Sequence, residues 1–408
     1  MRTMLRVSPQ VGAIAVLLMV VSSASPAAQE DVRALWVVRT TLTSPASIDA
    51  MVEAARAGGF NTLLVQVRGR GDRYYRHGSE PRAATLQRQP PSFDPLAHVI
   101  ARAHAAGLRV HAWVNANLVS SVAALPVERD HVIHRHPEWL MVPREVAAEL
   151  AGIRPSDPVY LERLAAYVRG RPGDLEGLYL SPIPSAAAAY TTGVIANLAR
   201  RYPVDGIHLD YVRYPAEDFD YGRPALSGFR SAMRDRLTAE ERRVHDARAD
   251  RDPLAYSEAF PEEWQEFRRN RLTALVAGIR RAVKTVRPTA LLSAAVIPDP
   301  DEASGRRFQD WPGWLAGGLL DVICPMVYTT DAGRFAQQVT AARRLAGRHT
   351  LWTGIGAYRL AEDQILDNVR TARELDVGGI VLFSYDSLAG TPRGPSYVTD
   401  LGRAAFAP

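Results

Sequence analysis

Apolar residues recur at every second position in short stretches spread along this chain. In Asn61–Val67, for example, Leu63, Val65 and Val67 fall on one face of an extended segment, and the residues between them fall on the other. Similar apolar runs predict about eight strands. They are Val32–Val38, Asn61–Val67, Leu108–Asn115, the strand that ends at Asp210, Leu291–Val296, Asp321–Val327, Leu351–Gly356 and Gly379–Ser384.

Between these strands, apolar residues recur at helical spacing. Ser47–Ala57 has this spacing, and Asp94 stands where it would cap a helix that runs to His104. Further helices are expected around Ala187–Arg200 and Trp264–Val283. Strands that alternate with helices predict an α/β fold, and about eight repeats favour a (β/α)8 TIM barrel over an open doubly wound sheet.

Two long segments interrupt this alternation, at about 118–184 and 216–261. The second directly follows the strand that ends at Asp210, and it contains the capping-box pattern Thr238–Glu241. Insertions in the βα loops of a barrel lie on its catalytic face and commonly wall a substrate cleft. We therefore expect one barrel domain over residues 28–408 that carries these two insertions.

The segment Asp205–Pro215 ends an apolar strand in a cluster of ionisable and aromatic side chains. Asp210 shares a strand face with His208, opposite the face of Ile207 and Leu209. Barrel enzymes keep their active sites at the carboxyl ends of the strands, so Asp210 is expected to point into the barrel mouth. His208 lies in the middle of the strand and is expected to be a hydrogen-bonded core histidine.

Aromatic, amide and cationic side chains follow several other strands. The third strand places Trp113 and Asn115 on one face, and the sixth strand leads into Tyr328. Flat rings and amides in one cleft suit sugars, which offer apolar ring faces and rims of hydroxyl groups. The side chains predicted to bind substrate are Arg68, Trp113, Asn115, Asn117, Arg213, Tyr214, Tyr328, Tyr358 and Tyr385.

Glycoside hydrolysis usually needs two carboxyl groups, one protonated and one ionised. Asp210 is the first candidate, and Asp72 and Asp386 are the candidates for its catalytic partner, since both are predicted at the mouth. The alternative for Asp210 is a structural carboxylate paired with Arg213 or Arg39. For Asp72 and Asp386 the alternative is a capping role in a loop.

The first 27 residues have the pattern of a secretory signal peptide. Basic residues at Arg2 and Arg6 precede the apolar run Val11–Val21, which is followed by small residues. The run is short for a bilayer span, which needs about 20 residues. We expect export to the periplasm or beyond, with no stable membrane anchor after cleavage; an uncleaved anchor is the alternative.

Composition narrows the remaining classes. The chain is 47% apolar and 23% charged, which fits a packed globule. The net charge of +5 is carried by arginines spread along the helices, with Lys284 the only lysine, so no nucleic-acid partner is expected. Cys324, the single cysteine, stands in an apolar stretch and is expected to be a core residue.

Motifs of other catalytic classes are missing from the sequence. It has no Gly-x-Ser-x-Gly elbow and no Gly-x-Gly-x-x-Gly after its first strand. His131, His134 and His136 lie in an insertion without further ligand spacing, so neither a metal nor a cofactor is expected.

Several segments of the chain carry a family resemblance: Arg33–Val37, Asn61–Arg68 with Gly71 and Asp72, Asp205–Pro215, Phe267–Asn270 and Pro325–Tyr328. Taken together, they resemble the glycosyl-hydrolase-like 10 family of exported bacterial proteins, and the resemblance covers most of the chain after the signal peptide. It implies a (β/α)8 barrel with glycosidase activity, an association with the bacterial envelope, and peptidoglycan glycan strands, stripped of their stem peptides, as substrate.

The chain departs from the family pattern at two places. Many members carry a second acid directly after the strand acid, where this chain has Tyr211, and Ser181 replaces an Asp or Asn of relatives. Two hypotheses follow: an exported glycoside hydrolase that uses Asp210, or a non-catalytic glycan-binding barrel. The sequence leaves the linkage, the anomeric outcome and the oligomeric state open.

Overall fold

The computed structural model describes residues 31–121, 123–390 and 392–406. The predicted signal peptide, residues 1–27, lies outside the described residues. Asp31–Pro408 form one compact unit. Among the described residues, no helix combines the length and the apolar character needed to cross a bilayer.

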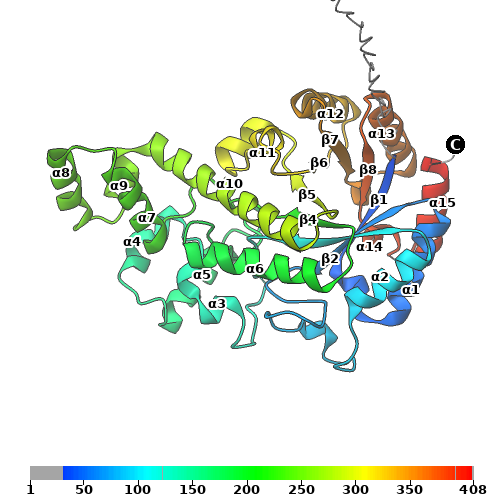
Figure 1. The fold of residues 1–408 in the computed structure, drawn as a ribbon, viewed down its shortest axis with the longest axis horizontal. Helices are drawn as coiled ribbons and strands as arrows, with labels where there is room; N and C mark the ends of the chain where they lie inside the picture. Colours follow the sequence, from blue (N-terminus) through cyan, green and yellow to red (C-terminus); the bar gives the residue numbers. More distant parts are fainter. Residues whose placement is uncertain (1–30, 122, 391, 407–408) are drawn as a thin grey trace, which may run out of the picture. The chain divides into compact units, whose positions relative to one another are not determined.

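Eight parallel strands close into a barrel in sequence order, with β1 paired to β8 (Figure 1). The predicted (β/α)8 TIM barrel is confirmed. The strands are β1 (Val32–Val37), β2 (Thr62–Arg68), β3 (Arg109–Asn115), β4 (Gly206–Asp210), β5 (Leu291–Val296), β6 (Val322–Val327), β7 (Thr350–Ile355) and β8 (Gly379–Phe383).

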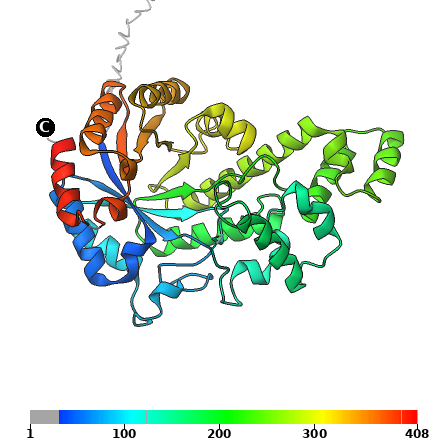
Figure 2. The ribbon, with the colours of Figure 1, turned by 180° about the vertical axis from the view of Figure 1, so that it is seen from behind.

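Helices connect successive strands and surround the barrel (Figures 1 and 2). The α-helices are α1 (Pro45–Ala57), α2 (Pro95–Ala105), α3 (Val132–Arg135), α4 (Arg144–Ala151), α5 (Pro158–Arg169), α6 (Ser185–Arg201), α7 (Arg223–Arg234), α8 (Ala239–Ala249), α9 (Ala255–Ala259), α10 (Pro261–Val286), α11 (Trp311–Ala316), α12 (Ala332–Ala346), α13 (Glu362–Glu374), α14 (Tyr385–Leu388) and α15 (Pro395–Phe406). Shorter turns are the 3-10 segments η1 (Arg39–Thr43), η2 (Ala84–Leu86), η3 (Pro137–Trp139) and η5 (Ala357–Arg359), and the π-helical η4 (Glu302–Arg306).

Local side-chain chemistry begins the predicted helices where expected. The Asp94 carboxylate accepts from the backbone N–H of Ala97 at 3.1 Å and caps α2. Thr238 and Glu241 form the reciprocal capping box of α8. Caps of this kind satisfy N–H groups that have no partner within the helix.

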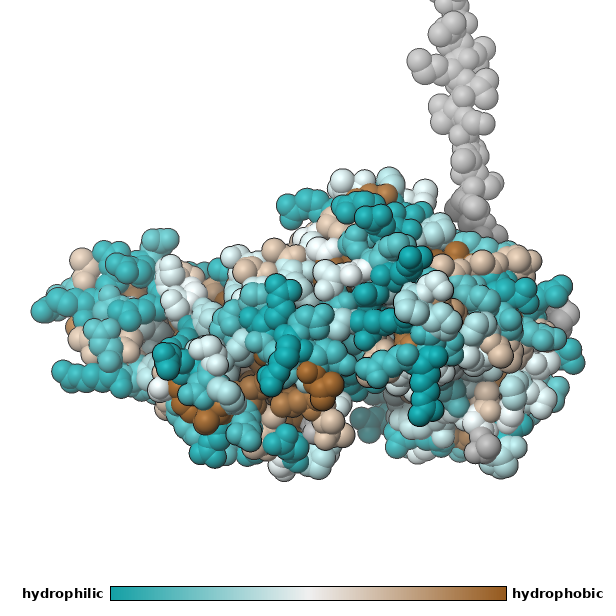
Figure 3. Space-filling model, turned by 90° about the horizontal axis from the view of Figure 1, so that it is seen from below, coloured by the Kyte–Doolittle hydropathy of each residue, from teal (hydrophilic) through white to brown (hydrophobic). Residues whose placement is uncertain are grey.

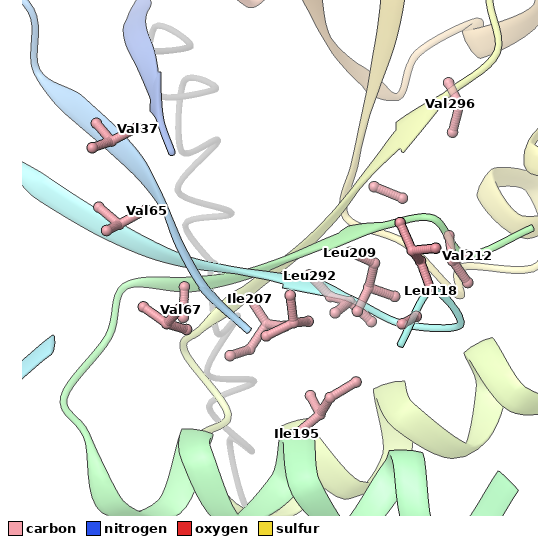
Figure 4. Packing of buried hydrophobic residues seen from close by; sticks show 14 of the residues in the cluster. Val37, Val65, Val67, Leu118, Ile195, Ile207, Leu209, Val212, Leu292 and Val296 are labelled. Carbon is pink, nitrogen blue, oxygen red and sulfur yellow. The ribbon is translucent and has the colours of Figure 1, made fainter. Parts of the chain in front are cut away.

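The main hydrophobic core lies between the outer face of the barrel and the helices. Figure 4 shows Ile207 of β4 and Leu292 of β5 directed toward Ile195 of α6, and all three are buried. These side chains alternate along their strands with residues that face the barrel interior. The alternation read from the sequence therefore assigns Ile207 and Leu209 to the helix side and His208 and Asp210 to the interior.

Large rings fill the barrel interior below its mouth. Trp36, Trp113 and Trp352 belong to one buried cluster there. Glycines on the barrel strands make room for interior rings: a Cβ at Gly354 of β7 would lie 2.7 Å from the Trp36 ring, and a Cβ at Gly206 of β4 would lie 2.4 Å from His111 Nδ1. The interior is a packed core up to the level of Asp210.

The segments predicted as insertions carry additional helices. Residues 118–184 contain α3, α4 and α5, and residues 216–261 contain α7, α8 and α9. Figure 1 shows α7, α8 and α9 next to each other at the amino-terminal end of α10, away from β1. The surface seen in Figure 3 is mostly hydrophilic, with a few separate apolar areas.

Candidate active site

A cavity of about 190 Å³ opens at the carboxyl ends of the strands. Its floor and walls come from the carboxyl-terminal parts of β1 to β6 and β8 and from the loops that follow several of them. Of the described residues that line it, Asp210 alone carries a carboxyl group. The lining residues are Trp36, Val38, Arg39, Gln66, Arg70, Trp113, Asp210, Tyr211, Arg213, Ala295, Met326, Tyr328 and Phe383.

Asp210 is the last residue of β4 and is 8% exposed. Its Oδ1 accepts from the Tyr211 backbone N–H at 2.6 Å, and its Oδ2 accepts from Trp113 Nε1 at 3.1 Å. Burial raises the pKa of Asp210 to about 6, although both hydrogen bonds and the charge of Arg213 act in the opposite direction. A carboxyl group with this pKa exchanges protons near neutral pH.

A chain of hydrogen bonds joins Asp210 to the other side of the cavity. Trp113 Nε1 also donates to Asn115 Oδ1 at 3.1 Å, and Gln66 Nε2 donates to the same oxygen at 3.3 Å. Gln66 Oε1 in turn accepts from Arg39 Nη1 at 2.9 Å. Because each amide is fixed by its neighbours, Trp113 is oriented with its N–H toward the carboxyl group of Asp210.

Aromatic rings form the wall opposite these polar groups. Trp36 lies edge-on to Phe383 at 5.8 Å and to Tyr328 at 6.3 Å, measured between ring centroids. Trp36 Nε1 donates to His208 Nε2 at 3.1 Å, which fixes the Trp36 ring from below. The wall is therefore rigid and apolar, as a surface for stacking a sugar ring should be.

Arg213 connects the cavity to an acid outside it. Its Nη2 donates to Glu176 Oε1 at 2.7 Å, and the Tyr179 hydroxyl donates to Glu176 Oε2 at 2.7 Å. Burial opposes ionisation of Glu176, but the Arg213 charge and these two hydrogen bonds outweigh it and lower the pKa of Glu176. Glu176 also raises the pKa of Asp210 through its charge, which places the two acids within electrostatic reach.

Glu176 lines a second hollow, of about 460 Å³, on the same face of the barrel. This hollow is lined by residues of the 118–184 segment and of the loops after β4 and β5, among them Tyr167, Asp218 and Arg307. The Arg213–Glu176 ion pair thus has one member in each hollow.

Tyr211 follows Asp210 with a φ of 48°, a backbone region that residues with a Cβ rarely adopt. Strain of this kind persists where surrounding contacts hold it, often at functional sites. The Tyr211 ring lies 4.8 Å below the Arg213 guanidinium and 6.1 Å from the Tyr179 ring. The unusual backbone at Tyr211 points its N–H at the Asp210 carboxylate.

Of the residues predicted to bind substrate, Trp113, Arg213 and Tyr328 line the cavity. Asn115 is fully buried beneath them and holds Trp113. Tyr358 is 50% exposed, and its ring lies 5.9 Å from Phe383 at the cavity edge.

Three predicted residues lie away from the cavity. Asn117 is buried, and its Nδ2 donates to the Leu180 carbonyl at 2.8 Å. Tyr214 is buried against Phe308, at 5.0 Å between ring centroids. Tyr385 begins α14 and is also buried. Their contacts serve packing, and the structure brings none of them to the cavity.

Arg68 was expected at the barrel mouth, and the structure places it outside the barrel wall. β2 carries an irregularity here: Gln66 pairs with Trp113, but Arg68 pairs with Val114. The extra residue moves Arg68 from the inner to the outer face of the sheet. There its guanidinium forms a buried ion pair with Glu80, with Nη2 at 2.7 Å from Oε1.

The two other predicted carboxylates also do not line the cavity. Asp386 accepts from the Val38 N–H at 2.6 Å and from the hydroxyls of Thr40 and Thr41, so it holds the end of β1 against α14. Asp72 Oδ1 accepts from the Arg70 N–H at 2.9 Å and caps that loop. The capping alternative considered for both residues matches these contacts.

Two further sequence features have structural explanations. His208 is fully buried, and burial lowers its pKa to about 3, so it is a neutral core histidine bonded to Trp36 and Ser293. Cys324 is a free, buried thiol.

The three histidines of the insertion each have partners of their own. The ring nitrogens of His131 and His134 lie 2.7 Å from the carbonyl oxygens of Arg70 and Pro126, respectively. His136 stacks on Trp139 and bonds Glu138. Among the described residues, no group of His, Cys, Asp and Glu suits a metal ion.

Several cavity residues were not among those predicted. Trp36 and Gln66 occupy interior positions of β1 and β2, so the alternation that found Trp113 applies to them as well. Arg39 begins the short segment η1 and Arg70 lies in the loop after β2, where no periodic signal exists. Glu176, outside the cavity, was also not predicted: it lies 34 residues before Asp210, within the 118–184 segment, and only the folded chain brings the two acids close.

Comparison with known proteins gives the following matches. The model of the family described as glycosyl hydrolase-like 10 matches residues 31–363. The glycosyl hydrolase DigH of Escherichia coli K12 is 24% identical over 346 residues, which cover 79% of this chain and 68% of DigH. The glycosyl hydrolase YngK of Bacillus subtilis is 22% identical and matches 66% of this chain and 46% of YngK.

Solved structures share the fold at low sequence identity. The PgaB (BpsB) glycoside hydrolase domain of Bordetella bronchiseptica superimposes with a TM-score of 0.61 at 14% identity, covering 91% of this chain and 98% of that domain. The catalytic domain of the β-amylase of Paenibacillus polymyxa gives a TM-score of 0.59 at 11% identity, covering 94% and 99%. The family match spans most of the chain, so the chain belongs to the glycosyl hydrolase-like 10 family.

Proposed function

Starting from membership of the glycosyl hydrolase-like 10 family, we propose that this protein is an exported glycoside hydrolase of cell-envelope polysaccharide. Peptidoglycan glycan strands freed of their stem peptides are the proposed substrate. Asp210 is the proposed proton donor to the glycosidic oxygen. The observation that carries the proposal is the buried Asp210 carboxyl group, seated at the barrel mouth against a wall of aromatic rings.

The protonation behaviour of Asp210 suits a general acid. With a pKa of about 6, roughly a tenth of the carboxyl groups are protonated at pH 7, whereas fewer than about one in a thousand would be at the ordinary value of 3.8. Burial is the largest cause of this shift, as for other general acids held in apolar pockets. Trp113 and the Tyr211 N–H hold the carboxyl group in one orientation for proton transfer.

The cavity walls suit a sugar ring. Trp36, Tyr328 and Phe383 present ring edges and faces, and Gln66 and Arg39 present hydrogen-bonding groups on the other side. A pyranose has apolar faces and a rim of hydroxyls, and it can contact both walls at once. Such two-sided contact would place the glycosidic oxygen beside Asp210.

Glu176 is proposed as the second carboxyl group of the reaction. It is ionised and hydrogen-bonded by Arg213 and Tyr179, as a base or nucleophile must be. If it activates a water, the reaction inverts the anomeric centre; if it attacks the anomeric carbon, a covalent ester forms and the configuration is retained. Proton NMR of the first-formed product distinguishes these outcomes.

The test compares two buried aspartates. Asp210→Asn removes the proposed acid, and we expect cleavage of purified glycan strands, read by mass spectrometry, to fall at least about a thousandfold. Asp220→Asn is the matched control: Asp220 is also buried with a pKa of about 6, but it bonds the Val142 and Gly222 N–H groups away from the cavity. An asparagine keeps the acceptor oxygen there, so cleavage should persist.

The pH profile gives a second readout of the same proposal. Because the acid must be protonated, kcat of the wild-type protein should fall about tenfold per pH unit above the pKa of Asp210, near pH 6. Full cleavage by the Asp210→Asn variant would remove Asp210 from the mechanism. Binding of glycan strands without cleavage by the wild-type protein would instead favour the glycan-binding alternative.

A further inference from the structure

Two arginines in the cavity have no acidic partner. Arg39 and Arg70 both line it, and neither forms an ion pair with any described residue. Arg213, the third arginine of the cavity, is paired with Glu176. With Asp210 as the single lining carboxyl group, the cavity therefore carries an excess of positive charge beside the proposed acid.

The two side chains lie close together around Gly69. Arg39 packs so tightly over this residue that a Cβ there would lie 2.7 Å from Arg39 Cδ. Arg70 Nη1 donates to the Gly69 carbonyl at 3.2 Å. Burial, and next the like charge of Arg39, lower the pKa of Arg70. The protein thus holds two cations near each other, and neither forms an ion pair with a described residue.

Hydrogen bonds to neighbouring residues hold both Arg39 and Arg70 in place. Arg39 Nη1 donates to Gln66 Oε1, and Gln66 is itself held by Asn115. The Arg70 backbone N–H donates to Asp72, and its carbonyl accepts from His131. Asp72 is thereby occupied as a backbone cap and forms no ion pair with the Arg70 guanidinium. The positions of the two cations are thus set before any ligand arrives.

Unused donors remain at the site. The Nε of Arg70 is buried without a hydrogen-bond partner. Arg213 is 7% exposed, and its Nε and Nη1 also have no partner. Buried N–H groups of charged side chains are costly to leave unpaired, so an anion bound in the cavity beside these guanidinium groups would be favourable. Guanidinium groups match carboxylates with two parallel hydrogen bonds.

We propose that Arg39 and Arg70 form a subsite for the carboxylate of an acidic sugar, next to the bond that Asp210 protonates. This inference rests on the proposed function, since it takes a glycan as the ligand. It adds the requirement that the glycan carry a negatively charged substituent on the sugar bound in the cavity. Neutral glycans of the same length are then poor ligands.

The experiment compares two forms of one ligand. Oligosaccharides of peptide-free glycan strands are used with their carboxylates free, or converted to neutral methylamides. Affinities are measured by calorimetry on the Asp210→Asn protein and, on ice, on the wild-type protein. We expect amidation to weaken binding about tenfold to a hundredfold, the range for losing charge-assisted hydrogen bonds.

Variants then assign the effect to the two arginines. Arg39→Gln and Arg70→Gln should each weaken binding of the free-carboxylate strands by a similar factor and leave binding of the amidated strands nearly unchanged. Arg76→Gln is the matched control, because Arg76 is exposed and outside the cavity, so the same loss of charge should have little effect. Equal binding of both ligands by the wild-type protein, or discrimination that survives in both variants, overturns the subsite.

Cleavage separates this inference from the proposed function. Equal cleavage of free and amidated strands overturns the subsite and leaves the hydrolase proposal standing. Arginine-dependent discrimination in binding without any cleavage supports the subsite and contradicts the hydrolase proposal. Failure of the wild-type protein to bind either ligand overturns the subsite as well.

Discussion

The arginines near the carboxyl end of β2 fall into two groups, which differ in whether their charges are paired. Arg68, outside the barrel wall, gives its Nε and Nη2 to Glu80, and its Nη1 donates to the carbonyls of Asn115 and Ala116. Arg39 and Arg70, inside the mouth, have no ion pair among the described residues, and the Nε of Arg70 has no hydrogen-bond partner. Arg68 has a structural role and its charge is neutralised by Glu80, whereas the charges of Arg39 and Arg70 remain available to a ligand.

The acids near the mouth differ in where they lie. Asp386 accepts from the Val38 N–H and from the hydroxyls of Thr40 and Thr41, and Asp72 accepts from the Arg70 N–H, and neither acid lines the cavity. Asp210 has two donors, lies at the cavity, and has a pKa moved toward neutrality. Position at the cavity, and not the number of hydrogen bonds, thus distinguishes Asp210 from Asp72 and Asp386.

The largest expected effect on stability comes from breaking the Arg68–Glu80 ion pair on the outer face of the barrel. Glu80→Gln leaves the buried Arg68 charge without its counter-ion, and we expect the free energy of unfolding to fall by about 3–5 kcal/mol. Arg70→Gln removes a cation that has no partner, so its stability should change by less than about 1 kcal/mol. Urea unfolding followed by circular dichroism measures both. Equal losses in the two variants would contradict the distinction between matched and unmatched arginines.

The next largest effect is the contribution of the Asp210 carboxyl group to the pH dependence of folding stability. Its folded pKa of about 6 exceeds the ordinary 3.8, so the folded state binds the proton more tightly and stability falls as pH rises from about 4 to 6. Two pKa units correspond to about 3 kcal/mol. We expect Asp210→Asn to be more stable than wild type by up to about 3 kcal/mol at pH 8 and equally stable near pH 3.

Thermal unfolding over this pH range measures that difference. Asp220 contributes in the same window, but it is present in both proteins and cancels. A variant less stable than wild type at pH 8 would show that the Asp210 carboxylate is stabilised by its neighbours, as the structural acids are.

A smaller effect is expected from Trp113→Phe. The ring wall is kept, but the indole N–H that stabilises the Asp210 carboxylate is lost. The pKa of Asp210 should therefore rise by roughly one unit, moving the alkaline limb of kcat upward by the same amount. An unchanged limb, measured across pH 5–9, would mean that Trp113 does not act on the Asp210 carboxyl group.

The smallest effect is expected for substitution of Tyr358 at the edge of the cavity, where only KM should change. Tyr358 is half exposed beside Phe383, so Tyr358→Ala removes one face for an outlying sugar. We expect KM to rise about threefold to tenfold, consistent with losing roughly 1 kcal/mol of ring contact, with kcat and stability unchanged. Steady-state kinetics on glycan strands test this. A fall in kcat would place Tyr358 nearer the reacting bond than the rim.

Much of the barrel could be predicted from the sequence, because strand identity and facing are local properties. Alternation of apolar residues placed each strand within about one residue of its observed bounds at most ends, and it assigned Asp210 and Trp113 to the interior. The same rule, applied to β1 and β2, would also have assigned Trp36 and Gln66. The position of Asp210 at a strand end then follows from barrel geometry alone.

Tertiary structure decided which charged side chains have a partner and which do not. A single irregularity between β2 and β3 moved Arg68 to the outer face, since one extra residue reverses every later side chain. Closure of β8 against β1 brought Asp386 to the N–H of Val38, almost 350 residues away in the chain. Glu176 reached Arg213 only through the fold of an insertion. Periodicity is fixed by neighbours in sequence, whereas the partner of a charge is fixed by neighbours in space.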